Sequence, residues 1–243
     1  MSRRGKSRRR GRRLWRWVGL GVFSVVVLVV VVGGVGWWLL RSEPAAWAEA
    51  GEEVDELPDA AEIAARLEAS IQAGITRPIT PGTTRTLEIP IDAANAWLET
   101  RLGLWLAAME RELPGQVSAM RFAARPGVVT GMVLLEHEGH QQVISADATA
   151  RVNPDGTMTA ELLALRLGRF PIPLSFVVDR LEDMSQQAGS RVGYQAGAYL
   201  RDGAEANGHT FPVVGPLPND TRDLRITGFT IESDRVLVDV VHE

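Results

Sequence analysis

The stretch from Val117 to Leu167, VSAMRFAARPGVVTGMVLLEHEGHQQVISADATARVNPDGTMTAELLALRL, decides the fold class of this protein. Apolar and polar residues alternate along it with the period of two that is typical of β-strands. Because short turns join antiparallel neighbours, the stretch predicts three or four antiparallel strands. The turn residues that separate them are Pro126-Gly127, Gly139 and Asn153-Pro154-Asp155-Gly156.

Helical patterns lie on both sides of this predicted sheet. Residues 59–74 (DAAEIAARLEASIQAG) repeat apolar side chains at helical intervals, and a short strand, TLEIPI at residues 86–91, follows them. Residues 91–115 predict a second helix, whose apolar stripe includes Trp97 and Trp105. Two alternating segments joined around residues 232–234 end the chain as a predicted hairpin. The expected fold class is α+β, with an antiparallel β-meander packed on long helices.

The segment that follows the meander, LGRFPIPLSFVVDRL at residues 167–181, places two prolines around one isoleucine. Pro171 and Pro173 have no N–H to donate to a sheet, and Pro173 suits the first turn of a helix. The segment therefore predicts a corner at which the strand ends and a helix to about Leu200 begins. Phe170 and Ile172 are expected to act as hydrophobic plugs at this corner.

Three glycines lie four apart on one ridge of that long helix. Each costs up to about 1 kcal/mol of helix propensity relative to alanine, so the spacing indicates that something approaches the backbone closely. Tight packing on a sheet or helix accounts for this, as does a ligand chain lying along the glycines, and the tryptophans are equally explained as core residues. The candidate apolar ligand groove comprises Trp97, Trp105, Phe170, Ile172, Gly189, Gly193 and Gly197.

Residues 17–40 (WVGLGVFSVVVLVVVVGGVGWWLL) form 24 consecutive positions without a charge. Because a helix needs about 20 apolar residues to cross the hydrocarbon core, the segment predicts a transmembrane helix. Residues 1–16 carry nine basic and no acidic side chains, which predicts a cytoplasmic N-terminus and an extracytoplasmic position for residues 41–243. Cleavage of the segment as a signal peptide is the alternative, although signal peptides have shorter apolar cores. Membrane-interface anchors are expected at Trp15, Trp17, Trp37 and Trp38.

The chain is expected to comprise a basic cytoplasmic tail (1–16), the transmembrane helix (17–40), a linker (41–58) and one extracytoplasmic domain (59–243). The linker is expected because residues 42–58 show little periodic apolar signal. Membrane topology and anionic lipid explain the basic tail without nucleic acid. The absence of cysteine excludes disulfides, thiol catalysis and thiolate zinc sites.

No motif in the sequence specifies catalysis. The densest polar cluster, LLEHEGHQQ at residues 134–142, has two histidines three apart in strand-like sequence, whereas zinc peptidases place them four apart on a helix. The chain has no Walker loop, dinucleotide fingerprint or nucleophile elbow. We therefore expect a protein that is not an enzyme and that uses neither a cofactor nor a metal.

The order of these segments resembles the YpmS-like family of membrane-anchored extracytoplasmic domains. The resemblance covers about residues 15–240 and is carried by an Asn-x-x-Leu helix after the first strand and by a Gly-x-hydrophobic-Pro-Ile-Pro corner. More loosely, the arrangement is similar to tubular lipid-binding domains, which implies a groove for an acyl chain between a curled sheet and a long helix. The matching residues are Asn95, Leu98, Gly168, Phe170, Pro171, Ile172 and Pro173.

Together these features favour a tethered, non-catalytic domain that binds lipid or another apolar ligand of the cell envelope between sheet and helix. Its expected partners are the bilayer and that ligand. A bitopic scaffold that recruits an envelope protein is one alternative. An envelope hydrolase is a weaker one.

Overall fold

The computed structural model describes residues 31, 33–35, 37–77, 82–108, 117–137, 139–173, 209–212, 214–216 and 223–242. The chain divides into two compact units, Met1–Ser42 and Glu43–Glu243.

The described part of the first unit is helical. Residues 31, 33–35 and 37–41 have helical backbone, and the side chains of Trp37 and Trp38 are exposed. The guanidinium of Arg41 lies 4.4 Å from the ring centroid of Trp37. Most of the predicted span, with Trp15 and Trp17, lies outside the described residues. Within the part of the chain that the structure describes, no helix is long and apolar enough to cross a membrane.

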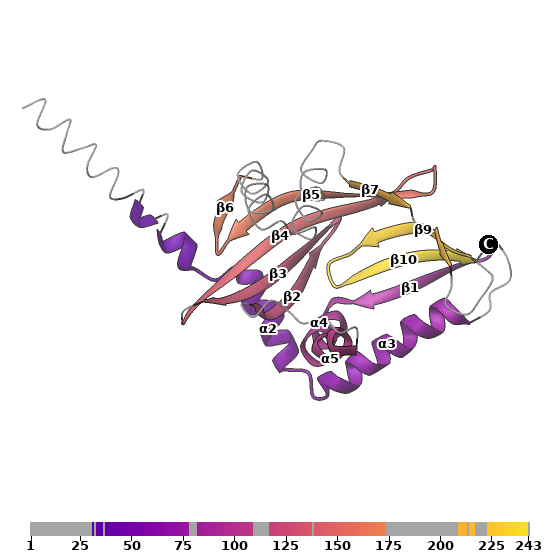
Figure 1. The fold of residues 1–243 in the computed structure, drawn as a ribbon, viewed down its shortest axis with the longest axis horizontal. Coiled ribbons are helices and arrows are strands. Elements are labelled where there is room, and N and C mark those ends of the chain that lie inside the picture. Colours follow the sequence, from indigo (N-terminus) through magenta and orange to yellow (C-terminus); the bar gives the residue numbers. More distant parts are fainter. Residues whose placement is uncertain are drawn as a thin grey trace, which may run out of the picture. The chain divides into compact units, whose positions relative to one another are not determined.

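The second unit has the α+β class expected from the sequence, and its strand pairs are antiparallel (Figure 1). The described strands form two sheets, one with the strand order β1-β10-β9-β8 and one with the order β2-β3-β4-β5-β6, to which β7 adds by pairing with β5. The helices are α2 (Ala45–Asp55), α3 (Ala60–Thr76), α4 (Ile91–Thr100) and α5 (Leu102–Ala108). The strands are β1 (Thr84–Pro90), β2 (Val117–Arg125), β3 (Val128–His137), β4 (His140–Val152), β5 (Thr157–Leu167), β6 (Phe170–Ile172), β7 (His209–Pro212), β8 (Val214–Pro216), β9 (Asp223–Ile231) and β10 (Arg235–His242).

The predicted meander is confirmed as the four consecutive strands β2 to β5. Pro126 and Gly127 form the turn between β2 and β3, where Arg125 pairs with Val128. Gly127 has a φ of 78°, a left-handed conformation that glycine adopts without steric cost. The predicted C-terminal hairpin is also confirmed, since β9 and β10 pair across the turn after Ile231.

The expected linker at residues 41–58 requires correction, because α2 occupies most of it. Trp47 and Val54 on this helix are 5% and 4% exposed. Trp47 belongs to a core cluster with Ala50, Met132 and Val143, so α2 packs on the inner face of the six-stranded sheet. The acidic residues of the helix lie on its other side. Because the helix has only three turns, its amphipathic pattern is difficult to recognise in the sequence.

The expected strand-to-helix corner around Pro171 also requires correction. Residues 168 and 169 form a tight turn, with Gly168 at φ 59°, and Phe170–Ile172 return as the short strand β6 against β5. Proline is tolerated there because β6 is an edge strand. Phe170 is 37% exposed, so it does not plug a core. The expected helix over residues 174–200, with Gly189, Gly193 and Gly197, lies outside the described residues.

Asn95 connects α4 to the edge of the six-stranded sheet. Its side-chain amide donates to the carbonyl oxygen of Phe122 at 2.8 Å, and its amide oxygen accepts from the N–H of Phe122 at 2.6 Å. Asn95 is 1% exposed, so both bonds are shielded from water. The start of α4 is tied in turn to the C-terminal hairpin, since the N–H of Ile91 donates to the carbonyl of Asp234 at 2.8 Å.

Candidate functional site

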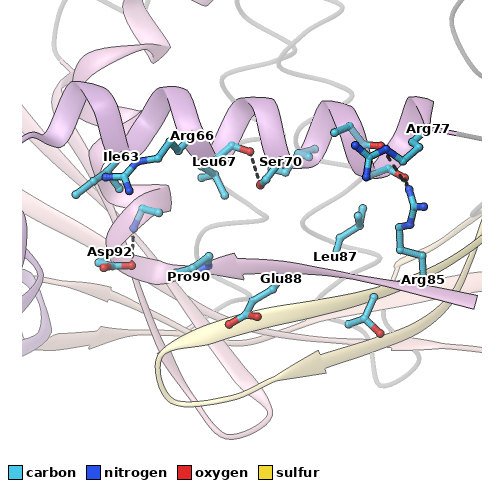
Figure 2. A pocket seen from close by; sticks show the side chains of 15 residues that line it. Ile63, Arg66, Leu67, Ser70, Arg77, Arg85, Leu87, Glu88, Pro90 and Asp92 are labelled. Carbon is cyan, nitrogen blue, oxygen red and sulfur yellow. Dashed lines mark hydrogen bonds between the residues drawn. The ribbon is translucent and has the colours of Figure 1, made fainter.

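A groove of about 800 Å³ lies between α3 and β1 and ends at the first turn of α4 (Figure 2). Its apolar lining comes from one face of the helix and from the strand. Charged side chains stand around it. The apolar lining includes Ile63, Leu67, Ile71, Leu87 and Pro90, and the charged residues are Arg66, Arg77, Arg85, Glu88 and Asp92.

The pattern of α3 explains why a groove forms here. Ile63, Leu67 and Ile71 repeat every four residues and line the groove that β1 borders, while Ala64 is fully buried. The helix packs mainly on α4 and only lightly on β1, which leaves space above the strand.

The groove closes at the C-terminal end of α3. Leu87 points from β1 toward the helix and packs on Gly74, where a β-carbon would collide with the Cδ2 atom of Leu87. Beside it, Arg85 donates from Nη1 to the carbonyl oxygen of Gly74 at 3.0 Å. A cation at a helix C-terminus is electrostatically favourable and satisfies a carbonyl that has no partner within the helix.

Positive charge dominates this closed end. Figure 2 shows Arg77 and Arg85 there, whereas Arg66 and Asp92 lie at the other end. Arg77 makes no ion pair among the described residues. The apolar lining and the guanidinium groups together suit an amphiphilic ligand with an anionic group.

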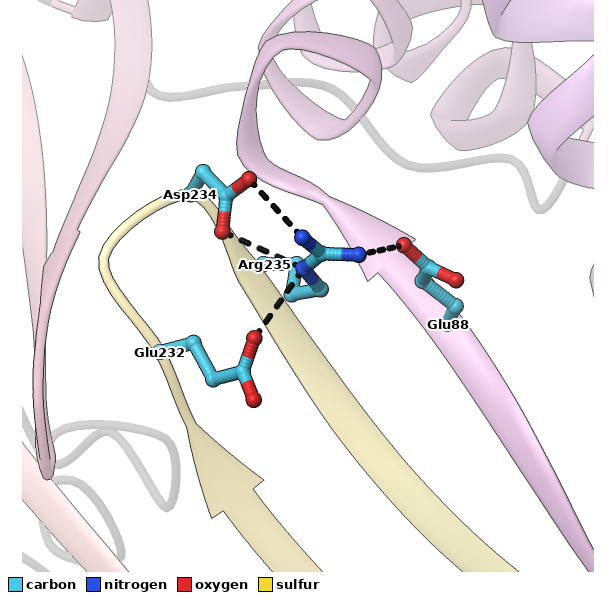
Figure 3. A network of polar contacts seen from close by, with 4 residues as sticks. All are labelled: Glu88, Glu232, Asp234 and Arg235. Carbon is cyan, nitrogen blue, oxygen red and sulfur yellow. Dashed lines mark hydrogen bonds and ion pairs between the residues drawn. The ribbon is translucent and has the colours of Figure 1, made fainter.

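The remaining carboxylate of the groove, Glu88, is engaged by a neighbouring strand. Arg235 on β10 contacts Glu88 at 2.5 Å, Glu232 at 3.1 Å and Asp234 at 3.2 Å (Figure 3). The hydrogen bond that Arg235 donates to Glu88, followed by those it donates to Asp234, raises the pKa of its guanidinium above the ordinary value. Because Arg235 offsets the charge of Glu88, the groove keeps an excess of positive charge.

The residues expected to form a ligand groove are separated in the structure. Trp97 and Trp105 meet edge to face, with ring centroids 6.1 Å apart, but neither lines the groove beside α3. Phe170 and Ile172 lie on β6, at the opposite edge of the six-stranded sheet from β2, on which α4 packs. The structure therefore does not bring these two pairs together.

Sequence reasoning recognised α3 as a helix but not its groove-forming role. The repeat of Ile63, Leu67 and Ile71 was visible, yet nothing local indicated that β1 lies opposite that face. No group of three or more His, Cys, Asp or Glu side chains that could hold a metal occurs in the portion of the chain with described coordinates.

Comparisons with protein-family models, with curated proteins and with solved structures found no match to this chain. The resemblance to the YpmS-like family accordingly rests on the motif residues alone. The structure adds that the asparagine of that motif, Asn95, hydrogen-bonds to the backbone of Phe122 at the sheet edge.

Proposed function

We propose that this protein is a membrane-tethered, non-catalytic extracytoplasmic domain that holds a lipid or another apolar envelope ligand in the groove between α3 and β1. The groove itself is the observation that carries the proposal. Its volume falls within the roughly 300–1,000 Å³ of small-molecule sites, and its apolar lining with a few charged groups is typical of them.

The energetics favour an acyl chain as the apolar part of the ligand. Each methylene group that leaves water contributes about 0.8 kcal/mol, so eight buried methylenes contribute about 6 kcal/mol before the ligand's ordering is subtracted. An anionic group at the closed end would contact the guanidinium of Arg77. That contact fixes the direction in which the ligand enters.

The tether is supported by the sequence of the first unit. Residues 17–40 carry no charge, and nine basic side chains precede them. Trp37 and Trp38 are 59% and 60% exposed, as expected for side chains that contact headgroups. We infer a cytoplasmic N-terminus and an extracytoplasmic second unit from the asymmetry of basic residues.

The proposal is tested by filling the groove and measuring the bound lipid. Ser70 lines the groove and its hydroxyl donates to the carbonyl of Leu67, so Ser70→Trp places an indole over the apolar lining. Ala69 is exposed and does not line the groove, which makes Ala69→Trp the matched control. Native mass spectrometry of the full chain, released from detergent, reports the lipid that remains bound.

Wild type and Ala69→Trp are expected to retain one lipid per chain, and Ser70→Trp is expected to lose it. Lipid bound to the hydrophobic segment would persist in all three proteins, so the difference between variants is the readout. If Ser70→Trp keeps the lipid while its melting temperature matches that of the control, the groove is not the lipid site.

A scaffold function is the second candidate, and α5 favours it. This helix has no buried residue, and Leu104 and Trp105 on it are 65% and 49% exposed. Neighbouring exposed apolar side chains mark interaction surfaces. A photo-crosslinking amino acid at position 104 should capture an envelope protein that the same amino acid at exposed Leu163 does not, and equal capture at both positions would reject the surface.

A further inference from the structure

A second cleft, of about 530 Å³, lies between the first turn of α2 and the inner face of the six-stranded sheet. It shares no lining residue with the groove beside α3. Charged and polar side chains line it beside small apolar ones. Those that the argument uses are Arg125, Ser145, Asp147, Arg166 and Arg169.

Two of the three arginines share one buried carboxylate. Asp147 is 3% exposed, and its Oδ2 atom accepts from Arg125 and Arg166, each at 2.9 Å. Thr130 donates to Oδ1 at 2.8 Å. Burial by itself raises the pKa of Asp147, but the bonds from Arg166 and Thr130 outweigh it, so the carboxylate stays charged and its pKa lies below the usual value.

The arginines retain donors for a further partner. One carboxylate cannot occupy both guanidinium groups, and the side chain of Arg125 is 61% exposed. Arg169 donates from Nε to the backbone carbonyl of Glu43 at 2.8 Å, which uses no negative charge. Glu49 is the other carboxylate of the lining, so three cations face two anions.

The first turn of α2 presents backbone donors to the same cleft. Ala45 and Ala46 line the cleft. No side chain caps the N-terminus of the helix, and its first turn contains no acidic residue. The carbonyl of Pro44 accepts from Trp47 and Ala48. In the described structure nothing accepts from the N–H groups of the two alanines, which therefore favour an anion at this helix end.

Ser145 offers one further hydrogen-bond donor to the cleft. It is 2% exposed, lies between Met132 and Arg166 on the neighbouring strands, and lines the cleft. Its hydroxyl is not among the fully buried side-chain atoms without a partner in the described structure, so it is accessible from the cleft. A ligand oxygen in the cleft would accept a hydrogen bond from it.

We propose that this cleft binds a phosphate-type anion, held by the guanidinium groups of Arg166 and Arg169, the hydroxyl of Ser145 and the free N–H groups of α2. A tetrahedral oxyanion has enough acceptor oxygens for donors that converge from a helix end and from two strands. The proposal does not depend on the groove beside α3. The phosphate belongs either to the headgroup of an anionic lipid or to a soluble molecule.

The test measures the melting temperature of the full chain in neutral detergent as inorganic phosphate replaces chloride at constant ionic strength. A saturable rise is expected for wild type. Arg169→Gln removes one charge-assisted bond and should weaken binding about tenfold, and Ser145→Ala should weaken it about threefold. Arg151→Gln removes the same charge from an exposed position of β4 outside the cleft and should bind like wild type.

Nanodiscs distinguish the two sources of phosphate. If the headgroup binds, adding phosphatidylglycerol to phosphatidylcholine discs raises the melting temperature of wild type and Arg151→Gln but not of Arg169→Gln. If a soluble anion binds, the lipid has no such effect and inorganic phosphate binds equally in both discs. The proposal is overturned if neither probe stabilises the wild type, or if Arg151→Gln and Arg169→Gln respond alike.

Discussion

Replacing Asn95 by alanine is expected to destabilise the second unit more than its position on a short helix suggests. Asn95 is 1% exposed and holds both backbone groups of Phe122, through bonds of 2.8 and 2.6 Å. Because β2 is an edge strand, no neighbouring strand can hydrogen-bond to the N–H and carbonyl of Phe122 in place of Asn95. Phe122 also lies opposite Gly131, where its ring packs over the glycine, so loss of the bonds would loosen the edge of the sheet.

The magnitude follows from the number of polar groups left unpaired. One hydrogen bond contributes about 1 kcal/mol net, and a buried group that loses its partner costs about 1–3 kcal/mol. Two backbone groups left without a partner reduce the free energy of unfolding by about 2–6 kcal/mol. Partial access of water at the sheet edge favours the lower half of this range. We expect a loss of about 3 kcal/mol, which lowers the melting temperature of a unit of this size by about 6–12 °C.

The assay is thermal unfolding of the full chain in neutral detergent, followed by circular dichroism. Thr100→Ala is the control, because Thr100 lies on the same helix and donates only to the carbonyl of Ala96 within it. Its expected cost is below about 0.5 kcal/mol. A loss for Asn95→Ala that falls within 1 kcal/mol of the control, a margin comparable to one net hydrogen bond, would refute the reasoning.

Asn95→Asp separates the two bonds. The carboxylate keeps an acceptor for the N–H of Phe122 but places a second oxygen against the carbonyl, so at neutral pH it should be at least as destabilising as alanine. Protonation restores a donor at that oxygen. The destabilisation should therefore shrink as the pH falls toward about 4, where carboxyl groups begin to protonate.

Three further changes test separate features of the fold. Trp47→Ala should cost about 3–5 kcal/mol in chemical denaturation, whereas a linker residue would cost almost nothing. Gly168→Ala should cost about 1–2 kcal/mol in thermal melts because its φ is 59°, and an unchanged melting temperature would argue against the turn before β6. Asp147→Asn should destabilise by about 2 kcal/mol at pH 7. Since the pKa of Asp147 is lowered in the folded state, its stabilisation is complete above about pH 4 and is lost as the pH falls further, so a difference that did not shrink in acid would contradict it.

Local patterns were sufficient to predict the elements that form from neighbouring residues. The meander followed from a period of two with turn residues between strands, and α3 was predicted at residues 59–74 and observed at Ala60–Thr76. Hairpins pair residues that are close in sequence, so their turns and alternation carry the information. These local patterns are sufficient to predict the α+β class.

The remaining features depend on contacts between distant residues. The pairing of Thr84 with Val241 places β1 in the C-terminal sheet, and no periodicity indicates that partner. β1 forms one wall of the groove beside α3. The sequence does not indicate α2 for a different reason, because the buried side of this helix is short. Part of its contact comes from β2, where the guanidinium of Arg121 lies 4.3 Å from the ring centroid of Trp47 and donates to the carbonyl of that residue.

The charges of the two cavities are local features rather than a consequence of composition. The chain has 30 acidic and 26 basic residues, and nine of the basic residues precede residue 17, so the rest of the chain is acidic. Such a surface repels anions at long range, but screening limits this repulsion to about 8 Å at physiological ionic strength. Arginines that gather at a groove end and beside a helix N-terminus then decide what binds at contact distance. Anion binding to the α2 cleft should therefore strengthen or hold steady as salt is raised from low to moderate concentration, until screening within the cleft reverses the trend.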